Sequence, residues 1–89
     1  MSISHGQLTA TTTPQLLFKA EADGNSITIH NDDAGSATAY LGSSASVTAS
    51  NGFHLAAKET MPSFVICPLA EVWVVTAAGT VEVSFFACN

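Results

Sequence analysis

Short runs of alternating apolar and polar residues are the feature that most restricts the fold of this chain. In "NSITIHN" (25–31), Ile27 and Ile29 alternate with polar residues, which predicts a strand with one buried face and His30 on the solvent side. The run "DDAGS" that follows supplies turn chemistry. No segment shows the 3.6-residue periodicity of a long helix, so the chain is predicted to be all-β.

Similar runs divide most of the sequence into short strands. The expected strands are 15–20, 25–31, 37–42, 45–50, 53–57, 61–67, 71–77 and 80–87. The dipeptide "NG" at 51–52 indicates a tight turn, and "AG" at 78–79 predicts a hairpin between the last two strands. About eight short strands at this spacing predict a single small antiparallel β-sandwich or jelly-roll-like barrel over 15–89. The Thr-rich residues 1–14 are expected to form a flexible N-terminal arm.

The chain carries few charges for its size. Its 89 residues fit one domain, and only 10% are charged while 47% are hydrophobic. Globular domains usually have about 25% charged residues. A small domain has much surface relative to its volume, so part of its apolar area is expected to meet another protein.

The sign and placement of the charges exclude some partners. Seven acidic residues stand against Lys19 and Lys58, for a net charge of −5. Two isolated lysines cannot supply the clustered cations that nucleic acids or anionic membranes require, so neither is an expected partner. No apolar run reaches the roughly 18 residues of a membrane span, and the N-terminus lacks secretory features. The chain is therefore expected to be made and kept in the cytoplasm.

The residues that could carry chemistry are scattered. His5, His30 and His54 lie far apart in the sequence, without the spacing of a metal site. Cys67 and Cys88 lie in apolar stretches, which predicts two buried, slow-reacting thiols, with a disulfide as the alternative. "GSSAS" lacks the G-x-S-x-G pattern, and most carboxylates fall in turns or at strand ends. We expect no catalytic, cofactor or metal site, and no enzyme.

The last two strands have more apolar positions than a core can cover. In "EVWVVTA", Trp73 and Val75 face one way and Val72 and Val74 the other, and in "TVEVSFFA" Phe86 lies opposite the other apolar residues. Only one face of each sheet can meet the core of a small sandwich. A contact between chains is therefore expected at some of four residues, namely Trp73, Phe86, Val72 and Val74. The alternative is that loops or the N-terminal arm cover them.

Several stretches together resemble a known group of proteins. The pattern is a strand ending in Asn ("SITIHN"), "AYLG", a Ser/Thr-rich strand, "GF-L", a Glu, and the closing "EVWVVTAAGTVEVSFF". It resembles the small β-sandwich virion proteins of tailed bacteriophages, from about Ser26 onward, although "MPSFVICPLAE" departs from it. The resemblance implies a structural virion protein, most specifically a capsid decoration (cement) or minor capsid protein that binds the head shell.

The resemblance also implies partners and a location, though it names no ligand. It implies a homo-oligomer, a trimer by analogy with decoration proteins, that contacts the major capsid protein. The chain would then reside in the virion after assembly in the bacterial cytoplasm, with no cofactor. A tail, neck or fibre-associated virion protein is the alternative, and a carbohydrate-binding module is a further one. The module would need exposed aromatic residues, of which only Tyr40 and Trp73 carry polar atoms.

Overall fold

The computed structural model describes residues 3–88, which form strands, turns and loops in two four-stranded sheets. The strands are β1 (Ile3–Ala10), β2 (Gln15–Lys19), β3 (Asn25–Asn31), β4 (Ala39–Gly42), β5 (Phe53–Leu55), β6 (Thr60–Ile66), β7 (Glu71–Thr76) and β8 (Val81–Cys88). This confirms the prediction of a small antiparallel β-sandwich. Among the described residues, none forms a helix that could cross a membrane.

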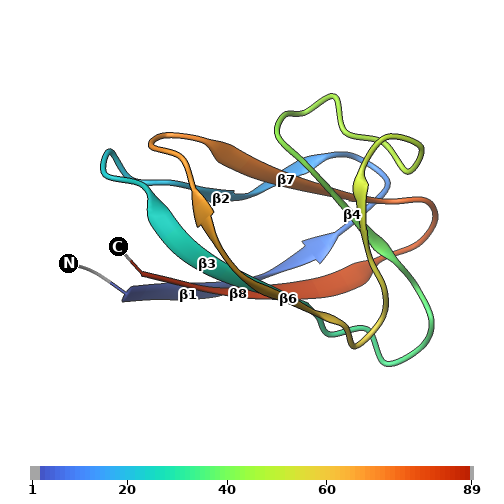
Figure 1. Cartoon of the computed structure of the whole chain (residues 1–89). Helices are drawn as coiled ribbons and strands as arrows, with labels where there is room; N and C mark the ends of the chain where they lie inside the picture. Colours follow the sequence, from blue (N-terminus) through green and yellow to red (C-terminus); the bar gives the residue numbers. More distant parts are fainter. Residues whose placement is uncertain (1–2, 89) are drawn as a thin grey trace.

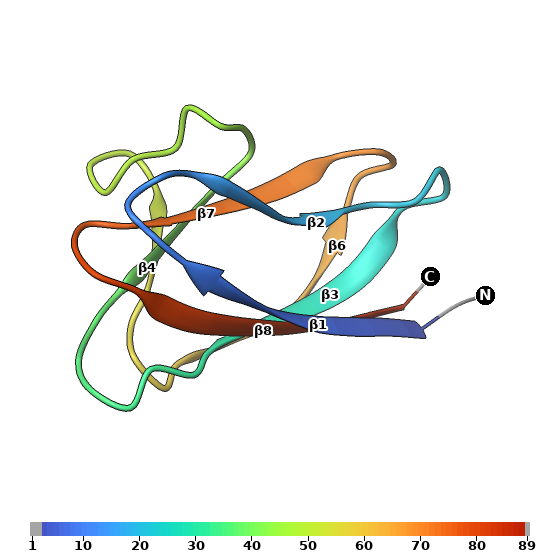
Figure 2. The same cartoon turned by 180° about the vertical axis from the view of Figure 1, so that it is seen from behind.

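The order of the strands is that of a jelly roll. Antiparallel pairs join β1 to β8, β2 to β7, β3 to β6 and β4 to β5, so the chain is one long hairpin with β4 and β5 at its tip. The hairpin winds between two sheets, which we call sheet A (β1-β8-β3-β6) and sheet B (β2-β7-β4-β5). Figures 1 and 2 show β2 and β7 lying over the strands of sheet A. Two Greek keys of this kind build an eight-stranded jelly roll.

Alternating residues from both sheets fill the space between them. Sheet A contributes Ile27, Ile29, Val81 and Val83, and sheet B contributes Leu41, Leu55, Val72 and Val74, all buried. The rings of Phe18 and Phe85 meet across this core with centroids 5.1 Å apart. The inward and outward directions predicted from alternation in 25–31, 71–77 and 80–87 are therefore correct.

The N-terminal segment is a strand and not the predicted arm. Residues 3–10 pair with β8 in continuous register, from Ile3 opposite Cys88 to Ala10 opposite Val81. Leu8 and Ala10 of β1 pack against the core, and the Phe85 ring occupies the space beside Gly6, where a Cβ would lie 2.9 Å from a ring carbon. Most of the predicted arm therefore belongs to the sandwich domain, and residues 1–2 lie outside the described part of the chain.

Two predictions of local structure are wrong. Residues 45–50 form turns between β4 and β5 and not a strand, because their hydroxyl and amide groups bond to the nearby backbone. The predicted hairpin at 78–79 is a connection between sheets, since β7 belongs to sheet B and β8 to sheet A. The turn is tight in either case, with Gly79 at φ 68° and its carbonyl accepting a hydrogen bond from Thr76 Oγ1.

Candidate functional site

The outer face of sheet A has an apolar end. Ile3, Cys88, Ser26 and Val65 lie opposite one another across its four strands. Phe86 lies in the next row of the same face, between His5 and Thr28. Ile3 is 65% exposed, Val65 79% and Phe86 58%. We call the group Ile3, Val65, Phe86 and Cys88 the apolar patch.

The apolar patch lies where several chain segments meet. The start of β1, the end of β8, the turn between β2 and β3 and the turn between β6 and β7 all lie at this end of the molecule (Figures 1 and 2). The turn after β6 adds two more exposed residues, Cys67 and Leu69. No member of the apolar patch is charged. Exposed apolar groups gathered in this way mark interaction surfaces.

Both thiols contradict the prediction that they are buried. Cys67 and Cys88 are exposed and free. Cys88 faces outward because β8 alternates from the inward Ala87, and Cys67 lies just beyond the last residue of β6. An apolar sequence context does not bury a residue at a strand end, where the sandwich no longer covers it.

The four predicted contact residues are separated by the fold. Val72 and Val74 are in the core, where they cannot contact another chain without unfolding. Trp73 lies on the outer face of sheet B, half-buried, with its indole Nε1 donating to Glu71 Oε1 at 2.8 Å. Only Phe86 lies in the apolar patch. Sequence reasoning missed Ile3 and Val65, and the signal for Val65 was the alternation in 61–67, which turns Phe64 and Ile66 inward.

The Ser/Thr-rich loop 43–52 covers the part of the outer face of sheet B around Val75. Val47 of this loop is buried, and Val75, which points outward from β7, is only 3% exposed. Thr12, Pro14 and the loop surround Val75 around a hollow of about 350 Å³. The chain itself therefore covers Val75, which is not one of the four predicted contact residues, while Leu16 on the same face of sheet B is 42% exposed.

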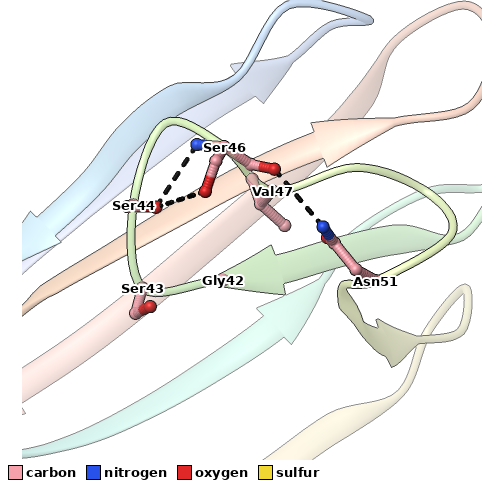
Figure 3. Close-up of a pocket in the computed structure, with 6 residues that line it drawn as sticks. All are labelled: Gly42, Ser43, Ser44, Ser46, Val47 and Asn51. Carbon is pink, nitrogen blue, oxygen red and sulfur yellow. Dashed lines mark hydrogen bonds between the residues drawn. The ribbon is translucent and has the colours of Figure 1, made fainter.

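A small polar hollow of about 170 Å³ opens in the same loop (Figure 3). Its polar groups already bind one another: the Ser44 and Ser46 hydroxyls lie 2.7 Å apart, and Asn51 Nδ2 donates to the Ser46 carbonyl. Asn51 Oδ1 also accepts from the Thr48 backbone N–H at 2.7 Å. These bonds hold the loop in shape, and we assign the hollow a structural role.

A hydroxyl, an imidazole and a carboxylate lie in series on the outer face of sheet A. His30 Nδ1 is 2.7 Å from Thr60 Oγ1, and His30 Nε2 is 3.4 Å from Asp32 Oδ1. The side chains of His30 and Asp32 are 36% and 27% exposed. His30, Asp32 and Thr60 do not line the hollows in loop 43–52 or the groove beside β6, so the group has no pocket of those beside it. This group acts as a cross-strand link between β3 and β6.

An apolar groove runs beside the edge strand β6. Leu41, Phe53, Met61, Phe64 and Val65 are among the residues around its volume of about 350 Å³. Phe53 is 60% exposed there. The groove extends the apolar surface of Val65 around the open side of the sandwich, toward β4 and β5.

Within the described residues, no cluster of His, Cys, Asp and Glu could hold a metal ion.

Comparisons with known proteins show a shared fold but do not assign the chain to a family. No family model matches the chain, and no curated protein matches it. Among solved structures, one similar chain belongs to the work titled "Bacillus endospore appendages form a novel family of disulfide-linked pili". The match covers 97% of this chain and 82% of that chain, at 16% identity and a TM-score of 0.53. At this identity the likeness shows a shared fold alone.

Proposed function

We propose that this chain is a structural subunit that attaches to a larger protein assembly through the apolar patch. The observation that carries the proposal is the gathering of Ile3, Val65 and Phe86, all exposed, at one end of the outer face of sheet A. On sheet B, loop 43–52 covers Val75, and Leu16 is 42% exposed. Rigid sheet faces with exposed apolar groups suit lasting contacts with another protein. In its specific form, the proposal is a capsid decoration or minor capsid protein of a tailed bacteriophage, bound to the major capsid protein.

The variant Phe86→Asp tests the attachment. Phe86 is 58% exposed, so its replacement should cost the isolated subunit less than about 1 kcal/mol of folding free energy. A carboxylate in the contact would be desolvated without a partner, and binding to phage shells assembled without this protein should fall by about a hundredfold. Co-sedimentation with such shells measures the binding.

The matched control is Ser84→Asp, two residues earlier on the same face of β8, at the polar end. It adds the same charge outside the apolar patch and should bind shells as the unmodified protein does. If both variants bind equally, the apolar patch is not the attachment site. If the unmodified protein does not bind shells but is found in purified tails, necks or fibres, the head assignment fails. Binding to a glycan array would favour the carbohydrate-binding alternative.

The exposed thiols favour a second candidate, a subunit of a disulfide-linked filament. The similar solved chain is described as part of disulfide-linked pili, and Cys67 and Cys88 are both exposed and free here. Exposed thiols should react with two equivalents of a thiol reagent in the native state. Under this candidate, oxidation should also give a ladder of covalent oligomers on non-reducing gels, lost in Cys67→Ser and in Cys88→Ser. Oxidised protein that stays monomeric would rule out the filament.

A further inference from the structure

The edge strands of the two sheets differ in how well they are protected. The edges are β1 and β6 in sheet A and β2 and β5 in sheet B. Natural sheets protect edges with short strands, proline, bulges and charged residues. β6 contains Pro62 and an irregular register, β2 has a bulge and ends in Lys19, and β5 has three residues.

β1 has none of these devices. It is eight residues long, pairs with β8 without a register shift, and contains no proline, lysine or acidic residue. Alternate backbone N–H and C=O groups of an edge strand point away from its neighbour, and in the described structure the strand partner of β1 is β8. Figure 2 shows β1 running along the molecule beside β8. The free side of β1 is a template for another strand.

We propose that β1 pairs antiparallel with β1 of a second copy, which joins two A sheets into one eight-stranded sheet. The unpaired backbone groups call for an extended strand, and β1 of a second copy can supply it without opposing acidic residues along the strand. Each copy carries a net charge of −5, so two copies can approach closely only where acids are absent. Glu82 is the acidic residue in register with β1, and its carboxylate accepts a hydrogen bond from Thr9 Oγ1 at 2.9 Å.

Symmetry restricts the register of the pair. A twofold axis perpendicular to the sheet keeps the outer faces of both copies on the same side of the joined sheet. The axis passes beside one residue of β1, which then lies opposite the same residue of the second copy. Because β1 has eight residues, the two registers with most overlap pair seven of them and are centred on Gly6 or on Gln7. With Gly6 on the axis, His5 faces Gln7 of the second copy; with Gln7 on the axis, it faces Thr9. Neither register opposes two like charges at neutral pH.

The pairing has a consequence for attachment that rests on the proposed function. Each apolar patch lies at the Ile3 end of β1, and antiparallel strands place these ends far apart. The dimer would therefore present two apolar patches on one continuous outer face. Two linked contacts bind a repeating shell more strongly than either alone, because the second contact forms within the same complex. The dimer itself does not depend on this function.

A charge at the centre of the pair tests the proposal in solution. Gln7→Lys places two ammonium groups beside the axis, and like charges across strands oppose pairing. We expect sedimentation analysis to show a dimer for the unmodified chain and a Kd about tenfold higher for Gln7→Lys. The control Thr28→Lys makes the same change in net charge on the same face of β3, an interior strand, and should leave the Kd unchanged within about twofold.

Cross-linking tests the same pair without relying on a destabilising change. In a Cys67→Ser/Cys88→Ser background, the double variant His5→Cys/Gln7→Cys brings two thiols into opposition in either register, and oxidation should give a covalent dimer. Thr28→Cys in that background should remain monomeric. A stable monomer, a trimer, a dimer insensitive to Gln7→Lys, or no cross-link in the double variant would each overturn β1 pairing. A β1 dimer that does not bind shells would overturn the proposed function alone.

Discussion

Replacing Asn31 by alanine should lower the free energy of unfolding by about 3 kcal/mol, because Asn31 makes three side-chain hydrogen bonds in the interior. Its Nδ2 donates to the carbonyls of Ala37 at 3.1 Å and Leu55 at 2.9 Å, and its Oδ1 accepts from the Asp33 N–H at 2.9 Å. Asn31 itself is fully buried. The variant removes a hydrogen bond to the Leu55 carbonyl at a buried site and two others at part-buried sites. Urea unfolding measures the loss.

Asn25 provides a matched control at the other end of β3. It is also buried, but its side chain bonds only within its own turn, with Oδ1 accepting from the Glu21 N–H at 2.7 Å and Nδ2 donating to Glu21 Oε2 at 3.2 Å. Asn25→Ala should therefore cost about 1 kcal/mol. Asn31→Asp should cost more than Asn31→Ala, since a carboxylate would face two carbonyl oxygens. Equal effects at the two positions would mean that Asn31 does not link the sheets.

Two residues of the pattern that resembles phage sandwich proteins take part in contacts of this kind. The Asn at the end of the strand is Asn31, which holds β5 through the Leu55 carbonyl. The Glu of the pattern is Glu59, whose Oε1 accepts from the Ala56 N–H at 2.8 Å. Both residues form the turns that connect the two sheets. The pattern therefore carries information about chain geometry, which explains why it names no ligand.

The alternation of apolar and polar residues correctly predicted which side chains of a strand point toward the core. The inward placement of Ile27 and Ile29, the outward placement of His30, and the opposition of Phe85 and Phe86 follow from a period of two residues. The all-β class came from the same signal, whereas the strand set did not fully follow from it, since β1 was missed and 45–50 is not a strand. Sheet order did not, because a short turn such as 78–79 has the same chemistry whether it joins neighbours in one sheet or crosses between sheets.

The failures have separate physical causes. In β1 the apolar Ile3 faces outward and a glycine fills an inward position beside the Phe85 ring, so the inward apolar residues Leu8 and Ala10 come only near the end of the strand. In 45–50 the apolar residues alternate, but Thr48 and Asn51 bond to the backbone and fold the chain into turns. The apolar patch was predicted only at Phe86, because its other members come together through pairing of distant strands.

Gly42→Ala should destabilise the protein by about 1–3 kcal/mol and loosen loop 43–52. A Cβ on Gly42 would lie 2.5 Å from both Cβ and Cγ2 of Val47, so the buried Val47 must move and the loop with it. The movement would uncover Val75 on β7, and hydrogen exchange in β4 and β7 should accelerate.

Gly35→Ala is the control for this change. A Cβ there would meet only Asp33 Oδ2, at 3.3 Å, in an exposed turn, so unfolding and exchange should stay nearly unchanged. If Gly42→Ala leaves stability and exchange unchanged while the loop remains closed, the packing of Val47 against Gly42 is not what holds loop 43–52 on sheet B. If exchange accelerates as expected, loop 43–52 shields Val75 of sheet B, while the outer face of sheet A keeps the exposed apolar patch that we propose for attachment.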